Sequence, residues 1–208
     1  MRKVALITDG WRRLFTYAWT AGILQRIRET GEDVNLYIFN STGNWSRDAG
    51  YNRAEYNIYN LPELSDFDGI ILELNNISSP AVLADVISNA KRSGRPVVSI
   101  ANELGDFYYV GIDNYSAMKQ VIAHLHEVHD CKKFWLLVGA QDNYESSCRL
   151  QGMLDYAKEH KIKIDKDDIW YGSFDYKSGL EGYKHLWDRH KELPDAVICI
   201  NDNVAVAV

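Results

Sequence analysis

The sequence predicts an α/β protein with two lobes, each a parallel β-sheet flanked by helices. Short apolar runs of strand length alternate with longer segments of helical periodicity along its 208 residues. Such alternation with short connections predicts right-handed crossovers and parallel sheets. The regularity pauses once, over 102–109. We therefore predict an N-terminal lobe over residues 1–103 and a C-terminal lobe over residues 104–208.

The first series of elements is predicted from four apolar runs and two helical segments. The strands are expected at Val4–Ile7, Val34–Phe39, Gly69–Leu72 and Val97–Ile100. The helices are expected near Phe15–Thr30 and Pro80–Ser93, and Pro80 suits the first turn of a helix. The segment Ser41–Asn60 is predicted to be a long irregular loop. Its aromatic residues indicate either a functional loop or aromatic packing beneath the loop; they are Trp45, Tyr51, Tyr56 and Tyr59.

The second series repeats the alternation after the pause. The strands are expected at Val110–Ile112, Phe134–Val138, Ile169–Tyr171 and Val197–Ile200. The helices are expected near Tyr115–Val128, Glu145–His160 and Lys177–Arg189.

The last strand carries the clearest functional signal. The run Val197–Ile200 is apolar throughout, which predicts burial on both faces of a sheet. Asn201 and Asp202 follow at once, at the carboxyl end where open α/β sheets bind ligands. We expect Asp202 to cap the helix that begins there. The sequence ends at Val208 with that helix barely begun, so we expect the second lobe to be truncated.

Composition excludes several classes of protein. The net charge of −6 argues against a nucleic-acid surface, which needs a basic face. No apolar stretch is long enough for a transmembrane helix, and the apolar run near the N-terminus suits a first strand better than a signal peptide. The three cysteines have no patterned spacing, which indicates reduced, buried or half-buried thiols in a cytoplasmic protein.

No enzymatic chemistry, cofactor or metal is expected from the motifs. The sequence has no Gly-x-Gly-x-x-Gly after either first strand, no Walker loop and no Gly-x-Ser-x-Gly. His124, His126 and His129 look like a metal set. On a helix, however, positions 124 and 126 point about 200° apart, so we expect these histidines on a solvated helix face.

Five segments of the second half, in order, resemble motifs in the effector domains of the lactose-repressor (LacI/GalR) family, which have the type I periplasmic-binding-protein fold. They are Val110–Tyr115, Lys133–Gly139, Ser146–Gly152, Gly172–Gly179 and Pro194–Asn203. In the first half the resemblance is carried mainly by Phe67–Ile71.

The sequence departs from the family pattern in two places. Repressors of this family carry a DNA-reading helix-turn-helix before the first strand, and here the first strand begins near residue 3. The family's domain also continues well beyond the Asn201–Asp202 pair, so a fragment is expected. The stretch Asn52–Leu61 resembles a subset of these sensors that lacks a DNA-binding head and precedes a GGDEF diguanylate-cyclase or another output domain.

The resemblance implies a ligand in a cleft between the lobes. The residues it places there are Asp9, Trp11, Phe15, Asn102, Asp113, Arg149, Phe174 and Asn201.

Four of these residues belong to the C-terminal lobe, and each has a plainer alternative role. Arg149 would bind vicinal hydroxyls or a carboxylate with its guanidinium fork; otherwise it is a surface arginine at a helix N-terminus, where the dipole disfavours it. Asp113 would accept hydrogen bonds from hydroxyls or cap the following helix, and both roles are compatible. Asn201 would donate and accept through its amide. Phe174 would stack on a sugar or base, or simply pack in the core.

The other four residues belong to the N-terminal lobe. Asp9, Trp11 and Phe15 follow the first strand, in the loop that faces the cleft in the family. Asn102 ends the fourth strand with Glu103, where sugar-binding relatives often have Asp-Arg. That departure argues against ribose or a simple hexose as the ligand.

The implied function is sensing of a small polar effector by hinge closure, in a homodimer that makes no contact with membrane or nucleic acid through this chain. Two alternatives remain open. One is a solute-binding protein that serves a transporter. The other is the effector domain of a DNA-binding repressor whose helix-turn-helix has been removed. The flanking sequence would separate the three.

Overall fold

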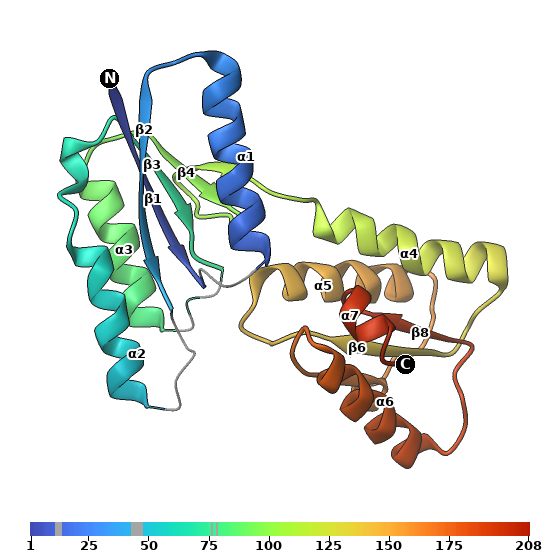
Figure 1. Ribbon diagram of the computed structural model, residues 1–208. Coiled ribbons are helices and arrows are strands. Elements are labelled where there is room, and N and C mark those ends of the chain that lie inside the picture. Colours follow the sequence, from blue (N-terminus) through green and yellow to red (C-terminus); the bar gives the residue numbers. More distant parts are fainter. Residues whose placement is uncertain (11–13, 43–47, 76, 78) are drawn as a thin grey trace. The chain divides into compact units, whose positions relative to one another are not determined.

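The computed structural model describes residues 1–10, 14–42, 48–75, 77 and 79–208 (Figure 1). The chain divides into two compact units, Met1–Ile112 and Asp113–Val208. Within the described residues, no helix is both long enough and apolar enough to cross a membrane.

The first unit is built on a parallel sheet of five strands. They are β1 Arg2–Asp9, β2 Val34–Ser41, β3 Gly69–Glu73, β4 Val97–Ile100 and β5 Tyr108–Val110. Their order across the sheet is β2-β1-β3-β4-β5. The four strands predicted for the first series, which correspond to β1 to β4, are therefore confirmed, because such apolar runs are what a sheet covered on both faces requires.

Helices cover both faces of this sheet (Figure 1). The helix α1 (Leu14–Thr30) lies on one face, and α2 (Ala49–Glu55) and α3 (Pro80–Arg92) lie on the other. Ser79 caps α3 and Pro80 occupies its first turn, as the sequence predicts. The main core lies on the side of α2 and α3, where Ile7 and Leu72 of the sheet are fully buried.

The prediction of an irregular loop over Ser41–Asn60 is wrong for its second half. The helix α2 is capped by Asp48, and a 3₁₀ turn, η1, follows over Tyr56–Asn60. Tyr56 and Tyr59 are buried in the core, which supports aromatic packing beneath this segment. Trp45 lies outside the described residues. The short helix α2 is hard to predict from the sequence, because it contains few aliphatic residues that would show a helical period.

The strand predicted at Val110–Ile112 is wrong in its bounds and in its partner. The strand β5 spans Tyr108–Val110 and pairs with β4 of the first sheet, so it closes the first series of elements rather than opening the second. The two compact units consequently divide after Ile112, later in the chain than the predicted boundary at Glu103. All three residues of β5 are exposed, so its sequence lacks the apolar pattern of a buried strand.

The second unit is built on a smaller parallel sheet. Its strands are β6 Phe134–Val138, β7 Ile169–Tyr171 and β8 Ala196–Cys199, in the order β7-β6-β8. Its helices are α4 Asn114–His129, α5 Tyr144–Glu159, α6 Tyr176–His190 and the short α7 Asp202–Ala205, with a 3₁₀ turn, η3, at Lys166–Asp168. Helices α4 and α5 pack together, and α6 covers the sheet from the other side (Figure 1).

The central strand of this sheet is β6, in which all five residues are buried. The strand β8 is only partly buried, contrary to the prediction of burial on both faces. Ile198 and Ile200 are buried, but Val197 and Cys199 are half-buried, because β8 forms an edge of the three-stranded sheet.

Two glycines allow helices to approach closely in the second unit. A Cβ atom on Gly152 of α5 would lie 2.3 Å from the backbone oxygen of Tyr115 in α4. A Cβ atom on Gly179 of α6 would lie 2.7 Å from the backbone oxygen of Val204 in α7. Larger residues at either position would force the helices apart.

Candidate functional site

Polar groups gather at the carboxyl end of the second sheet. Each of the four helices of this unit begins with a side chain that caps its first turn; the capping residues are Asp113, Asn143, Asp175 and Asn201. Helix N-termini favour negative charge and hydrogen-bond acceptors. Against that background a cation close to the start of α5 needs specific partners.

Arg149 has such partners on three different elements. Its Nε donates to Oδ1 of Asn114, at the start of α4, over 2.7 Å. Its Nη1 donates to the backbone oxygen of Ile200, at the end of β8, over 2.9 Å. Its Nη2 lies 4.0 Å from a carboxylate oxygen of Glu145, one turn earlier on α5. The guanidinium group is thus held in one orientation before any ligand arrives.

Asn201 contributes both ends of its amide. Its Oδ1 accepts from the backbone N–H of Val204 over 3.0 Å, and its Nδ2 donates to the backbone oxygen of Phe174 over 3.0 Å. The prediction that Asp202 caps this helix is therefore wrong. Asn201 has extended backbone angles and is the last residue outside the helix, whereas Asp202 is already in the first turn.

Phe174 and Gly139 are close neighbours in this region. A Cβ atom on Gly139 would lie 2.5 Å from the ring of Phe174, so the glycine makes room for the aromatic side chain. Phe174 is half-buried and also packs against the hydrophobic core. The ring therefore belongs in part to the core, as the plainer alternative predicts.

Asp113 caps α4 by accepting from the backbone N–H of Ser116 over 2.9 Å. These hydrogen bonds hold the pKa of the Asp113 carboxyl below its usual value, because they favour its charged form. The capping role is confirmed, and a ligand contact stays a prediction.

The carboxyl end of the first sheet holds a buried polar cluster around Asp9. The Asp9 side chain is fully buried, and its Oδ1 accepts from the hydroxyl of Ser41 over 2.9 Å. The hydroxyl of Tyr59 donates to the backbone oxygen of Thr8 over 2.9 Å and lies 3.1 Å from Ser41 Oγ. Burial raises the pKa of Tyr59, and nearby Asp9 raises it further. Within this unit Asp9 therefore supports the strand ends, and its ligand contact stays a prediction.

A second buried carboxylate stands beside it. Glu73 ends β3 and accepts from the hydroxyl of Thr8 over 2.6 Å. Only 3% of Glu73 is exposed. Sequence reasoning missed this residue, because an acid at the end of an apolar strand carries no signal of burial.

The other predicted residues of the first unit are more scattered. Phe15 is 75% exposed on α1, and Trp11 lies outside the described residues. Asn102 follows Ala101, which has a positive φ of 65° at the end of β4. The Oδ1 atom of Asn102 is buried and has no hydrogen-bond partner among the described residues.

The structure thus brings together Arg149, Phe174 and Asn201, with Asp113 adjacent through its neighbour Asn114. Asn114 and Glu145 complete this group, and sequence reasoning did not select them. Asn114 stands next to Asp113 in the motif that carries the resemblance, and Glu145 precedes Arg149 by one helical turn. These two neighbour relations are the only features of the sequence that point to Asn114 and Glu145.

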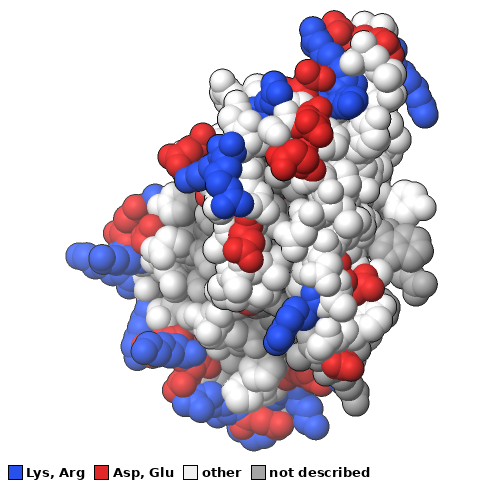
Figure 2. Space-filling view, turned by 90° about the vertical axis from the view of Figure 1, so that its left-hand side faces the viewer, with Lys and Arg blue, Asp and Glu red and all other residues white. Residues whose placement is uncertain are grey.

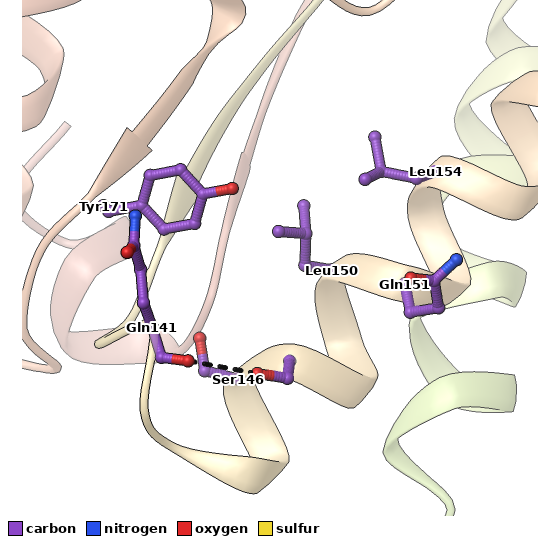
Figure 3. A pocket seen from close by; sticks show the side chains of 7 residues that line it. Gln141, Ser146, Leu150, Gln151, Leu154 and Tyr171 are labelled. Atoms are coloured by element: carbon purple, nitrogen blue, oxygen red, sulfur yellow. Dashed lines mark hydrogen bonds between the residues drawn. The ribbon is translucent and has the colours of Figure 1, made fainter. Parts of the chain in front are cut away.

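A separate hollow of about 380 Å³ lies on another face of α5 (Figure 3). Leu150 and Leu154 point into it from α5, and Tyr171 and Gln141 approach from the ends of β7 and β6. None of the predicted site residues lines it.

The three cysteines and the histidines of α4 lie outside the group around Arg149. Cys131 is buried, Cys148 and Cys199 are half-buried, and all three are unpaired thiols. Burial raises the pKa of the Cys199 thiol to about 11. Nε2 of His124 lies 3.2 Å from Nε2 of His129, and His126 instead meets Tyr156. The described residues contain no group of three or more side chains suited to a metal ion.

Charges of both signs are interspersed on the face shown in Figure 2, where lysine and arginine side chains lie among aspartate and glutamate side chains.

Comparison with known proteins identifies the family. Residues 51–208 match the family model described as periplasmic binding proteins and sugar binding domain of LacI family. The catabolite control protein A of Staphylococcus epidermidis is 29% identical over 156 residues, which are 74% of this chain and 45% of that protein. The chain spans less than half the length of this curated relative.

Solved structures show the same fold. The structure of the transcription regulator CcpA of Lactococcus lactis aligns with this chain with a TM-score of 0.71 at 21% sequence identity. The alignment covers 100% of this chain and 70% of the CcpA chain. The complex of the transcriptional regulator CelR with cellobiose has a TM-score of 0.72 at 24% identity, over 99% of this chain and 60% of its own. The chain belongs to the family of periplasmic binding proteins and LacI-type sugar-binding domains.

Proposed function

We propose that this chain is the sensing domain of a bacterial regulator and that it binds a small, polar, sugar-like molecule at the carboxyl ends of its strands. The observation that carries this proposal is the fixed guanidinium group of Arg149. Such a group is pre-organised, so little conformational entropy is lost when a ligand binds it.

The neighbouring side chains suit a polyhydroxyl ligand. A guanidinium group has five N–H donors, and Asn114 and Ile200 engage one each in this structure. Other donors of Arg149 can bind ligand hydroxyls. Phe174 supplies an aromatic ring of the kind that stacks on the apolar face of a sugar. Asn201 places an amide beside it.

The proposed mechanism is a shift in a pre-existing equilibrium between open and closed arrangements of the two units, which the ligand biases towards the closed one. We propose that the protein is cytoplasmic, acts without catalysis, and works as a homodimer that passes the change to an output domain. Tyr17 and Leu24, exposed apolar residues of α1, support pairing through the helices of the first unit.

A thermal-shift screen of neutral sugars, nucleosides and amino acids tests the proposal. A ligand at about 100 times its Kd adds about 2.7 kcal/mol of stability, or about 5–10 °C in Tm for a chain of this size. The wild-type protein should show such a shift with at least one compound. Arg149→Ala should lose most of it.

The control is Arg189→Ala, which removes an exposed arginine of α6 that pairs with Asp167. This variant should keep the full ligand-induced shift. If no compound stabilises the wild type, the sensing function is wrong. If Arg149→Ala responds as strongly as the wild type, the site is wrong.

A further inference from the structure

We infer that Glu145 makes the Arg149 site electrically neutral and thereby excludes anionic ligands such as sugar phosphates and carboxylates. This inference rests on the proposed function and names the charge class of the ligand. It assigns Glu145 a role as a residue that determines specificity.

Glu145 and Arg149 lie one turn apart on the same face of α5. The carboxylate oxygen Oε1 of Glu145 is 4.0 Å from Nη2 of Arg149. Only 24% of the Glu145 side chain and 20% of the Arg149 side chain are exposed. Water and salt therefore screen this pair less than a surface pair, and the negative charge of Glu145 acts on a group that approaches the guanidinium group.

Asn114 contacts both charged groups, so that the three side chains form a closed network of contacts. Its Oδ1 accepts from Nε of Arg149 over 2.7 Å, and its Nδ2 donates to Oε1 of Glu145 over 3.3 Å. The carboxylate cannot swing away from the arginine without losing the hydrogen bond from Asn114. The backbone oxygen of Ile200 holds the guanidinium group from the other side. The neutral pair is therefore a fixed feature of the site.

A ligand that reaches the outer nitrogens of Arg149 must also approach the carboxylate of Glu145. An anion would meet a like charge there at short range, and such juxtapositions are strongly unfavourable. A hydroxyl group has a donor for the carboxylate and an acceptor for the guanidinium group. The pair consequently favours uncharged polyhydroxyl ligands.

A purely structural role for Glu145 predicts something different. Its charge would then stabilise the start of α5 and leave ligand choice unaffected. A comparable pair, Lys177 and Glu181 on α6, has the same spacing but is 83% and 56% exposed. It therefore offers a matched control, in which the same charge is removed from a cation and acid pair in solvent.

The test uses inorganic phosphate as the probe and calorimetric titration as the measurement. Four proteins are compared: the wild type, Glu145→Gln, Glu181→Gln, and Glu145→Gln combined with Arg149→Ala. We expect Glu145→Gln to bind phosphate at least about tenfold more tightly than the wild type, because the like charge is gone. Glu181→Gln should match the wild type, and the double variant should lose the gain.

The inference is overturned if Glu145→Gln binds phosphate no better than Glu181→Gln, or if the gain persists without Arg149. Should Glu145→Gln fail to fold, Glu145→Ser carries the same comparison. The sugar screen fails separately when no neutral compound binds the wild type. Phosphate titration still reports the effect of Glu145 in that case, so the two failures are distinguishable.

Discussion

At the scale of single residues, buried hydrogen bonds hold together the carboxyl ends of the strands in the first unit. Asp9, Ser41 and Tyr59 come from three separate segments and meet at the ends of β1 and β2. A buried polar group that loses its partner costs more than the bond contributes. The strand ends should therefore be sensitive to small changes there.

Tyr59→Phe tests this point by removing one oxygen atom. The backbone oxygen of Thr8 would lose its donor in a buried setting, so we expect a loss of about 1–2 kcal/mol in the free energy of unfolding. Urea denaturation followed by circular dichroism measures it. Tyr108→Phe is the control, because Tyr108 is 72% exposed and its variant should stay within about 0.5 kcal/mol of the wild type. Equal losses in both variants would contradict the assignment.

The candidate site could be predicted only in part at this scale. Arg149 and Asn201 follow from the resemblance, since each stands in a motif of the family. Glu145 and Asn114 do not, because their meeting depends on α4 packing against α5, and sequence spacing does not encode contacts between helices that lie far apart in the chain. The burial of Asp9 and Glu73 was missed for the same reason: their partners come from other strands.

At the scale of elements, glycines set how closely helices approach. Gly152 lets α5 lie against the first turn of α4, which carries Asn114 and thus one partner of Arg149. The spacing of these two helices therefore supports the site as well as the core.

Gly152→Ala is expected to push α4 and α5 apart, because the new Cβ atom would lie 2.3 Å from a backbone oxygen. Overpacking of this kind costs about 1–3 kcal/mol. Gly22→Ala in α1 is the matched control: nothing lies within 4 Å of its Cβ position, and alanine favours the helix by about 1 kcal/mol. In thermal unfolding, Gly152→Ala should lower the Tm and Gly22→Ala should raise it. A Gly152→Ala protein with a raised Tm would refute the close packing.

Helix caps should make the second unit sensitive to acid. Asp175 accepts from the backbone N–H of Ser178 over 2.8 Å, and that bond holds the pKa of its carboxyl below the ordinary value of 3.8. A lowered folded pKa means that the unfolded state binds protons first as the pH falls. The stabilisation is therefore present above about pH 4 and is lost as the pH falls through the folded pKa.

Asp175→Asn keeps an acceptor for the cap but does not titrate. We expect the wild type to lose more stability than Asp175→Asn between about pH 5 and about pH 3. Asp175→Ala should be less stable by about 1 kcal/mol at pH 7. Urea denaturation at each pH provides the comparison, and parallel pH profiles for wild type and Asp175→Asn would count against the cap.

Element prediction succeeded where the signal was strong. The strands at Phe134–Val138, Ile169–Tyr171 and Val97–Ile100 have the predicted bounds, since short apolar runs between turn residues leave little choice. It failed for α2 and β5. The first is short and polar, and the second is an exposed edge strand whose partner, β4, is set by the sheet and not by local pattern.

At the scale of the whole molecule, the two compact units have separate cores and the same kind of parallel sheet. In each, polar side chains collect where parallel strands end, as open α/β sheets require for ligand binding. In the second unit these side chains surround a charged pair that is fixed before the ligand arrives. We propose that Arg149 anchors a small polar ligand there.

Calorimetric titration of a ligand from the screen into the wild type and Arg149→Ala tests this claim most directly. Loss of a charged partner in a desolvated site costs about 2–5 kcal/mol, so Arg149→Ala should bind at least about 30-fold more weakly, while Arg189→Ala binds as the wild type does. An Arg149→Ala protein that binds within about threefold of the wild type would contradict the account.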